Sequence, residues 1–493
     1  MGKLEQFEWN LLIKRKLLIT FAAGAELKEG RMKIRTHEEH REAGKALRQK
    51  CPRPSHGKVV LGQGKRDIVA LIAASNEGRV ERLVPIRHGR MLQSAFAYFR
   101  GTAMIQAYDL AKTPVSGINV QACGDCHLMN FGGFATPERT LVFDINDFDE
   151  TLPAPFEWDI KRLAASFVIA ARWRGFKPRQ ARGIAVQAVT SYRESMGNRA
   201  ETGVLEAWYS RISFEDVRAL AGKDAETLSR LQKRVSEAKK STHEHVFNKL
   251  TAPKKGLPRI VDQPPLIYHV AHTGKQRLTL RDVEAFFKPY RESLPEERRV
   301  LFDRYTLIDF AAKVVGVGSV GTRCYVTLFL AAPDDPLFLQ VKEARPSVLE
   351  RFTGQKRVEH NGRRVVVGQR LMQSASDIFL GWSEAPRIGR DFYIRQLRDM
   401  KISPLVETMT PQLLLGYAKL CGLALARAHD KAGDAAMIAG YLGGSDRFDE
   451  AIGDYAVAYA DQVERDYETF AKAVRSGRLK SDLSPSQMET ILR

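Results

Sequence analysis

Residues 123–159 read CGDCHLMNFGGFATPERTLVFDINDFDETLPAPFEWD, the most informative stretch of this chain. Asp125, His127 and Asn130 come first, in the order D-x-H-x-x-N, and a strand-like run then ends in Asp147-Phe148-Asp149. Phosphoryl transfer needs a carboxylate beside the attacking hydroxyl and hard oxygen ligands that hold Mg²⁺ against the phosphates. Asp125, Asn130 and Asp147 provide all three groups. The stretch therefore predicts a phosphoryl-transfer site.

A helix is predicted directly after this stretch. From Trp158 onward, apolar residues fall at i, i+3, i+4, i+7, i+8 and i+11: Ile160, Leu163, Ala164, Phe167, Val168 and Ala171. This spacing is typical of an amphipathic helix that packs on a core. Phe156 and Trp158 are expected in that core. Asp144 is interpreted either as a support for the metal ligands or as a partner of a nearby arginine.

A second motif lies far downstream, where Gly316-Val-Gly-Ser-Val-Gly321 fits G-x-G-x-x-G. In a dinucleotide-binding fold such glycines open a helix, but here residues 322–328 continue as an alternating strand. A strand, a glycine loop and a second strand form a hairpin, as in the glycine-rich loop that covers ATP phosphates in kinases. The next strand carries Lys342, where a kinase places its phosphate-binding lysine. A tight turn with a solvated lysine is the alternative interpretation.

Composition bounds the class of protein. The chain has 493 residues, 44% hydrophobic and 27% charged, which is ordinary for a globular protein of two to four domains. No run approaches the roughly 18 apolar residues of a membrane span. The net charge of +19 (77 basic minus 58 acidic residues) favours anionic ligands. The basic residues are scattered and no basic helix is interleaved with aromatics, so nucleic acid is an unlikely partner.

The cysteines and the first residues bear on the compartment. Five scattered cysteines do not form a disulfide framework. Residues 14–16 are basic and residues 17–25 apolar, a weak export signal without a clean cleavage site, and Met32 is a more natural start. We expect a cytoplasmic protein. Cys123-Gly-Asp-Cys126-His127 also matches haem-attachment and C-x-x-C redox or zinc patterns, but zinc would need two further ligands, so the cysteines are interpreted as incidental.

Four segments are expected along the chain. Residues 1–60 are polar and peripheral, with one helix near residues 36–48; residues 61–250 form a helical part with the catalytic and metal-binding loops. A polar linker at residues 249–265 leads to a β-rich nucleotide-binding part at residues 262–400, with a further strand at residues 364–367. Residues 405–493 are helical again, at 413–429 and 451–474, and complete the helical part. The expected fold class is α+β.

Several motifs resemble a bacterial family of unknown function, number 2252. They are Arg87-His-Gly-Arg-Met-Leu92, the Cys-Gly-Asp-x-His-x-x-Asn-Phe-Gly run ending at Gly132, Asn146-Asp-Phe-Asp-Glu-Thr151, Trp158-Asp-x-Lys-Arg-Leu-Ala164, Gly368-Gln-Arg-Leu-Met372 and Leu425-Ala-Arg-Ala-His429. The resemblance covers nearly the whole chain from about residue 35. It implies no established activity.

A more distant resemblance, to the aminoglycoside-phosphotransferase and choline-kinase-like proteins, rests on spacing. Asn130 follows Asp125 by five residues and Asp159 follows Asp147 by twelve, similar to the corresponding gaps in that group. The order of motifs differs, because the catalytic loop here precedes the glycine loop by about 190 residues. The resemblance therefore implies a two-lobed, protein-kinase-like fold that is circularly permuted, as exposed loops permit.

The resemblance also implies roles for single residues. Asp125 would act as the base, while His127 would brace the loop or take part in chemistry. Asn130 and Asp147 would hold Mg²⁺, and Lys342 would contact the phosphates of ATP, paired with Glu350 or else Glu343 or Glu359. Gly316, Gly318, Ser319 and Gly321 would cover those phosphates. The implied activity is an ATP- and Mg²⁺-dependent phosphotransferase with an unknown acceptor; a non-catalytic nucleotide-binding or scaffold protein is the alternative.

Overall fold

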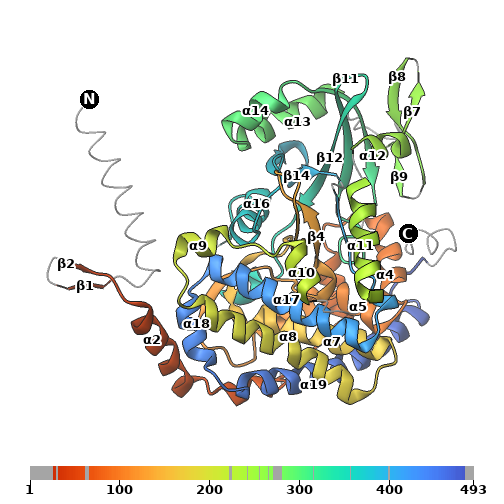
Figure 1. Ribbon diagram of the computed structural model, residues 1–493. Coiled ribbons are helices and arrows are strands. Elements are labelled where there is room, and N and C mark those ends of the chain that lie inside the picture. Colours follow the sequence, from red (N-terminus) through yellow and green to blue (C-terminus); the bar gives the residue numbers. More distant parts are fainter. Residues whose placement is uncertain are drawn as a thin grey trace.

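The computed structural model describes residues 26–28, 31–61, 66–220, 225–240, 243–254, 256–264, 266–269, 280–314, 316–355, 357–397 and 400–482. Its strands pair antiparallel and most of its helices gather apart from the main sheet, so the fold is α+β (Figure 1). None of the described helices is long and apolar enough to cross a membrane. The basic and apolar segment at residues 14–25 lies outside the described residues.

A helical region occupies the lower half of Figure 1, and its helices come from both the N-terminal and the C-terminal parts of the chain. Its N-terminal helices are α2 (His37–Lys50), α3 (Ile68–Asn76), α4 (Val84–Met91), α5 (Ala95–Arg100), α6 (Ala103–Leu110), α7 (Phe156–Trp173), α8 (Pro178–Arg199), α9 (Val204–Tyr209) and α10 (Phe214–Leu220). Its C-terminal helices are α17 (Pro411–Ala432), α18 (Ala435–Leu442) and α19 (Arg447–Arg475). Helix α17 packs along α8, and α19 crosses α7 and α8.

The predicted helices of this region are confirmed. The periodic apolar residues of α7 are all buried, as are Phe156 and Trp158. The helices expected at 413–429 and 451–474 are α17 and α19. Helix α2 begins at a Thr36–Glu39 capping box. It packs on α18, with the backbone of Arg41 against Gly440, and Cys51 and His56, which follow it, are buried.

A six-stranded antiparallel sheet lies above the helical region, in the order β13-β14-β12-β11-β10-β9 (Figure 1). Its strands are β9 (Ile267–Tyr268), β10 (Thr306–Lys313), β11 (Cys324–Ala332), β12 (Asp335–Ala344), β13 (Gly381–Ala385) and β14 (Arg390–Gln396). Helices α13 (Leu280–Ser293) and α14 (Glu296–Phe302) cover one face. Helix α12 (His243–Leu250), which follows α11 (Ala225–Lys240), covers the other together with strand β8.

Two expectations about the sheet region need correction. The expected linker at residues 249–265 contains the hairpin of β7 (Thr251–Lys254) and β8 (Leu257–Ile260). The expected strand at residues 364–367 is part of helix α16 (Asn361–Met372), which follows the short helix α15 (Glu350–Thr353). Val365 and Val366 are buried while Val367 is 48% exposed. Packing of one helical face against β13, β14 and α17 has therefore overridden the strand propensity of three valines.

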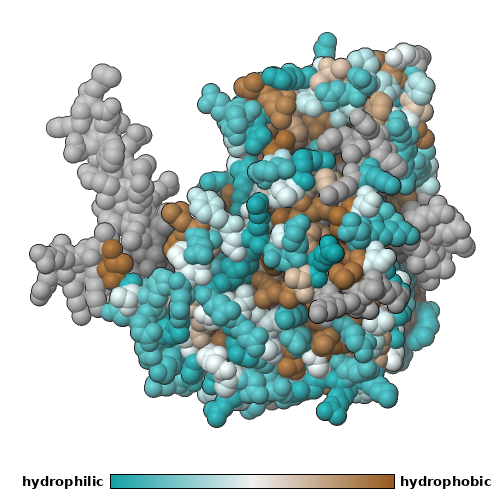
Figure 2. All heavy atoms as spheres, viewed as in Figure 1, coloured by the Kyte–Doolittle hydropathy of each residue, from teal (hydrophilic) through white to brown (hydrophobic). Residues whose placement is uncertain are grey.

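Short strands carry the stretch that contains Asp125 and Asp147, between the two regions. Strands β3 (Asn119–Ala122) and β6 (Leu152–Pro155) pair, and β4 (Phe131–Ala135) pairs with β5 (Leu141–Ile145) across the turn at Thr136–Thr140. Strand β4 lies on the side of the helical region that faces the sheet (Figure 1). Hydrophilic side chains cover most of the visible helical region, with apolar residues in smaller patches toward the middle of the view (Figure 2).

Candidate functional site

A cleft of about 700 Å³ lies between the helical region and the sheet region. Its lining includes most of the predicted site residues: Asp125, His127, Asn130, Asp147, Gly316, Gly318, Ser319 and Glu350. Lys342 contacts the lining residue Asp149, and Gly321 belongs to the same glycine loop as Gly316 and Gly318. Tertiary folding has thus brought together two motifs that are about 190 residues apart in the sequence.

The buried carboxylate of Asp159 fixes the loop that carries Asp125. Asp159, in the first turn of α7, accepts hydrogen bonds from the backbone N–H groups of Cys123 at 2.7 Å and Gly124 at 3.0 Å. Gly124 has a φ of +82°, and a Cβ there would lie 2.3 Å from the carbonyl oxygen of Glu150. Only glycine fits this turn without strain. The loop is therefore a rigid platform for Asp125.

One carboxylate oxygen of Asp125, Oδ1, is bound by Arg162, and the other, Oδ2, is left available. The guanidinium of Arg162 approaches Oδ1 from Nε at 2.8 Å and Nη2 at 2.7 Å. Burial raises the pKa of Asp125, whereas the neighbouring Arg162 acts to lower it. A carboxylate with one engaged oxygen keeps Oδ2 available to accept a proton or a hydroxyl hydrogen bond. Sequence reasoning missed Arg162, although it belongs to the Trp158–Ala164 motif.

His127 lies beside Asp125 as a neutral side chain. Its Nε2 is 3.9 Å from Asp125 Oδ2, which is too long for a hydrogen bond. Burial, with the charges of Arg162 and Arg100, lowers the pKa of His127 well below its usual value. Its Nδ1 is buried without a hydrogen-bond partner among the described residues. An uncharged imidazole at this place supplies no positive charge to the cleft.

Asn130 and Asp147 both present oxygen atoms to the cleft. The Asn130 amide donates through Nδ2 to the backbone carbonyl of Asp125 at 2.7 Å, which leaves Oδ1 for another ligand. Asp147 accepts a single long hydrogen bond, from the N–H of Asp149 at 3.3 Å. Burial and the charge of Asp149 raise the pKa of Asp147. One amide oxygen and one under-coordinated carboxylate form a donor set that suits Mg²⁺.

Lys342 on β12 reaches across the cleft and forms an ion pair with Asp149. The same carboxylate accepts a hydrogen bond from the hydroxyl of Tyr393 at 2.7 Å. Burial acts to lower the pKa of Lys342, but the charges of Asp147 and Asp149 outweigh it and raise that pKa well above its usual value. The ammonium is therefore permanently charged beside Asp147. Tyr393 gave no sequence signal, since it lies 244 residues from Asp149.

The expected pairing of Lys342 with Glu350 does not form. Glu350 opens the short helix α15, where it accepts the N–H of Ser347 at 3.2 Å. Glu343, the other candidate, pairs with Arg323 at 3.1 Å and Arg390 at 3.2 Å. Asp149, which stands two residues after Asp147 in the turn that follows β5, pairs with Lys342 in place of these glutamates.

The glycine loop joins β10 and β11, as predicted, and closes the upper side of the cleft. Gly316 and Gly321 have φ values of +67° and +89°, which favour glycine. Arg90 donates to the carbonyl of Gly316, and Arg79 donates to that of Val320 at 2.6 Å. The loop is thus attached to the helical region through arginine side chains.

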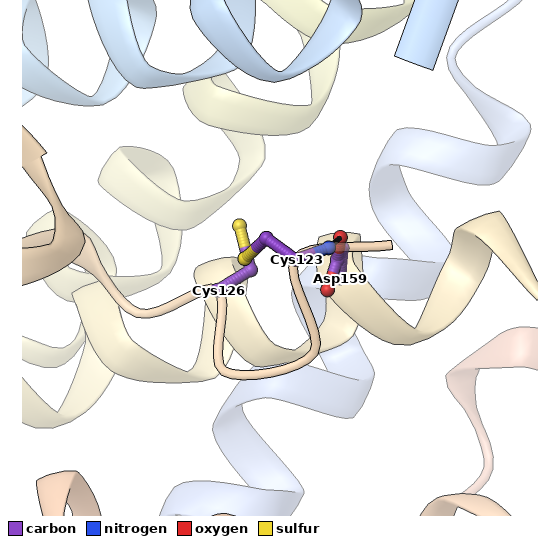
Figure 3. Close-up of side chains that lie close together, drawn as sticks. All are labelled: Cys123, Cys126 and Asp159. Atoms are coloured by element: carbon purple, nitrogen blue, oxygen red, sulfur yellow. Dashed lines mark hydrogen bonds between the residues drawn. The ribbon is translucent and has the colours of Figure 1, made fainter. Parts of the chain in front are cut away.

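The two cysteines beside Asp125 are buried and reduced. Figure 3 shows their sulfur atoms next to each other, with Asp159 of α7 on the side of Cys123. Donor atoms of these three residues lie within 4.8 Å of one another. Both Asp159 oxygens already accept backbone hydrogen bonds, and burial raises the pKa of both thiols. Three such donors do not complete the four-coordinate set of a structural zinc site.

Comparison with known proteins places this chain in one family. Residues 79–473 match the family described as "Uncharacterized protein conserved in bacteria (DUF2252)", and the chain belongs to it. Neither the curated proteins nor the solved structures contain a match to this chain.

Proposed function

We propose that this protein is an ATP- and Mg²⁺-dependent phosphotransferase that acts on a hydroxyl-bearing acceptor. The observation that carries the proposal is the cleft itself. It joins an Asp125–Asn130–Asp147 oxygen set on one wall to a glycine loop on the other, with Lys342 reaching across to Asp149. Phosphoryl transfer is catalysed almost entirely by positioning and charge compensation, and these groups provide both.

The topology of the sheet region supports the proposal. A glycine loop connects β10 to β11, a lysine lies on the next strand, β12, and helix α16 follows before β13. Protein kinases combine a glycine-rich loop, a lysine on the third strand and a following helix in this way. That helix carries a glutamate partner for the lysine in kinases, whereas here Asp149 takes this role.

A permuted connection is consistent with the position of α17. Gly433, which ends that helix, is so close to Val120 that an added Cβ would lie 2.6 Å from its Cγ1. The end of α17 therefore adjoins β3, the strand that leads into the Asp125 loop. A chain joined at this point would run from sheet to α17 to catalytic loop, the order of the kinase-like proteins. The packed core would be unchanged by the different termini.

The residues of the cleft have distinct roles in this proposal. Asp125 orients the acceptor hydroxyl and accepts its proton through Oδ2, while Arg162 fixes the carboxylate through Oδ1. Asn130 Oδ1 and the Asp147 carboxylate would hold Mg²⁺, which neutralises phosphate charge when bound. Lys342 has three N–H donors, so it can contact a phosphate oxygen while retaining Asp149. The glycine loop would cover the same phosphates.

One observation favours a non-catalytic nucleotide-binding protein as second candidate. Arg162 neutralises Asp125, and an ion-paired carboxylate is a weaker base than a free one. A protein of this kind would bind nucleotide in the same cleft and transfer no phosphate. The two candidates therefore differ only in turnover.

Calorimetry with Mg²⁺ and ATP, together with phosphate transfer to a cell extract, tests both candidates. We expect the wild type to bind ATP only with Mg²⁺ and to label an acceptor. Asp147→Ala should abolish the dependence of ATP binding on Mg²⁺. Asp149→Asn should retain this dependence, because the Asp149 side chain already binds Lys342 and Tyr393. Asp334→Asn, in the exposed turn between β11 and β12, is the matched control.

Absence of ATP binding at millimolar concentration would refute the proposal. Binding without any transfer would instead select the non-catalytic candidate.

A further inference from the structure

Three arginines line the cleft beside the proposed transfer site. Arg87 is on α4, Arg79 precedes the short turn that leads into α4, and Arg345 directly follows β12. Arg87 is 2% exposed, and the other two are partly buried. None of the three belongs to the oxygen set or to the glycine loop. We call them the arginine cluster.

Neutral oxygen atoms hold all three side chains in place. Arg79 donates to the carbonyls of Ser75 at 3.0 Å and Val320 at 2.6 Å. Arg87 donates to Asn76 Oδ1 and to the carbonyl of Gly101, both at 2.6 Å. Arg345 donates to the carbonyls of Ser75 at 3.3 Å and Glu77 at 2.5 Å. Such bonds orient a guanidinium without neutralising its charge.

The charges of the cluster act on one another. Burial and the charge of Arg345 lower the pKa of Arg87 to about 10. Burial, followed by the charges of Arg87 and Arg345, also lowers the pKa of Arg79. No carboxylate among the described residues lies within 4.0 Å of any nitrogen of the three. Glu150 and Glu343 are the acidic groups that act on both Arg79 and Arg345. Glu150 accepts the N–H of Val348 at 2.7 Å, and Glu343 is already paired with Arg323 and Arg390.

Several other arginines of low exposure are neutralised by carboxylates, whereas the buried Arg90 and Arg364, like the cluster, donate to backbone carbonyls. Arg66 pairs with Asp109 and Asp466, and Arg193 pairs with Asp449 at 2.9 Å. Arg427, which is fully buried, pairs with Asp144. An uncompensated buried charge costs several kcal/mol. A cluster of three that faces a cleft is therefore a place where an anion would be stabilised.

The cluster adjoins the reacting groups. Arg87 bonds to the carbonyl of Gly101, next to Arg100, whose charge acts on Asp125. Arg79 bonds to the glycine loop. An anion on the cluster would thus lie beside the base and below the loop, in the cleft that holds both. ATP phosphates have a separate set of partners in Lys342 and the Asn130–Asp147 metal site.

We propose that Arg79, Arg87 and Arg345 form a subsite for the anionic group, a phosphate or a carboxylate, of the acceptor. This rests on the proposed function, which supplies the acceptor. Guanidinium groups bind both kinds of anion through paired N–H donors. The acceptor would then be a negatively charged hydroxyl compound rather than a cationic one.

Calorimetry with inorganic phosphate, and separately with citrate, probes the subsite directly. Each titration is done with Mg²⁺ and a saturating non-hydrolysable ATP analogue. We expect phosphate or citrate to bind in addition to the analogue, and Arg345→Gln to weaken that binding about 10- to 100-fold, as for loss of a charged hydrogen bond. The stronger of the two anions identifies the class of acceptor group.

Two further variants separate binding from folding. Arg345→Lys keeps the charge and should retain most of the anion binding, while thermal unfolding reports any loss of structure. Arg351→Gln is the matched control, because Arg351 lines the same cleft but faces Glu77 at 3.7 Å. Displacement of phosphate by the analogue would overturn the subsite, as would equal binding by wild type and Arg345→Gln, or no binding of either anion.

The acceptor itself is tested with the cell extract. Passing the extract through an anion-exchange resin should remove the compound that the wild-type protein labels with phosphate. Labelling that survives this step would overturn the anionic acceptor. Anion binding that is lost in Arg345→Gln, in a protein that binds no ATP, would support the subsite and refute the proposed function.

Discussion

The two walls of the cleft are held in different ways. The Asp125 loop is bound to buried side chains of the helical region, with Asp159 accepting two of its N–H groups and Ser166 a third at 3.0 Å. The glycine loop of the sheet region is held by arginines that donate to its carbonyls, and Gly316 is exposed. The difference teaches that the Asp125 loop is preformed, whereas the glycine loop depends on a few polar contacts. In the proposed function, the first loop serves the nucleophile and the metal, and the second covers the phosphates. Each prediction below probes one wall.

The largest effect is expected on turnover when the helical wall loses its base. Asp125→Asn keeps a hydrogen-bond acceptor for Arg162 but removes the carboxylate that takes the proton. We expect phosphate transfer to fall by about 10²- to 10⁴-fold, as for a positioned general base. ATP binding, measured by calorimetry, should be nearly unchanged. A variant that transfers phosphate at the wild-type rate would remove Asp125 from the reaction.

Loss of a buried support should affect stability most. Asp144 lies on β5, after the β4–β5 turn. Its carboxylate pairs with the fully buried Arg427 and accepts two hydrogen bonds from Ser374. Asp144→Ala leaves a buried charge alone, and the free energy of unfolding should fall by about 3–5 kcal/mol.

Asp454→Ala is the control for that substitution. Its partner Arg182 is partly exposed and Asp454 is 65% exposed, so removal of the pair should cost less than about 1 kcal/mol. Urea unfolding measures both variants. Equal losses would contradict the view that buried charges fix this wall.

Lys342→Ala probes the sheet wall. It removes the cation that faces Asp149 and, in the proposed function, the phosphates of ATP. Mg²⁺-dependent ATP binding should weaken about 10- to 100-fold, as for loss of a charged hydrogen bond. Lys313→Ala, which removes a lysine from β10, two strands away from β12 in the sheet, is the control. Unchanged affinity in Lys342→Ala would show that the lysine serves Asp149 alone.

Glu150 joins the two walls and gives stability a pH dependence. Burial, with the charges of Asp149 and Asp125, raises the pKa of Glu150 to about 7. Between about pH 4.5 and pH 7, the folded protein therefore keeps a proton on Glu150 that the unfolded chain has lost. This proton stabilises the folded state, and its contribution to the free energy of unfolding disappears as the pH rises through that range. The new side chain in Glu150→Gln can still accept the Val348 N–H. The substitution should remove the pH dependence of the free energy of unfolding, which amounts to about 1–3 kcal/mol. Thermal unfolding at pH 5 and pH 8 measures it; parallel curves for both proteins would contradict the assignment.

The smallest effect is expected at the cysteines. Cys126 is buried next to Cys123, but its sulfur makes no contact with Asp125 or Asn130 that the reaction needs. Cys126→Ala should lower the free energy of unfolding by about 1 kcal/mol, as for a small buried group, and should leave ATP binding unchanged. Bound zinc or covalent haem in the purified protein, detected by its metal content and absorption spectrum, would contradict this.

The sequence by itself determined the local pieces of this protein. Apolar periodicity located α7, α17 and α19, because a helix repeats its buried face every 3.6 residues whatever it packs against. Glycine spacing predicted the β10–β11 hairpin, since the positive φ of Gly316 and Gly321 is a local requirement. The order of Asp125, His127 and Asn130 within one loop placed three polar residues of the cleft.

Only the tertiary structure decided which distant groups meet. The partner of Lys342 is Asp149, 193 residues away, rather than a glutamate on the following helix. The three valines at 365–367 became helical because α16 packs between the sheet and α17. Tyr393 and Arg162 bind carboxylates of the cleft, and the arginine cluster lines it, all from separate elements. Pairing of charges depends on burial and on distances of a few ångströms, and neither quantity is encoded in the spacing of residues along a chain.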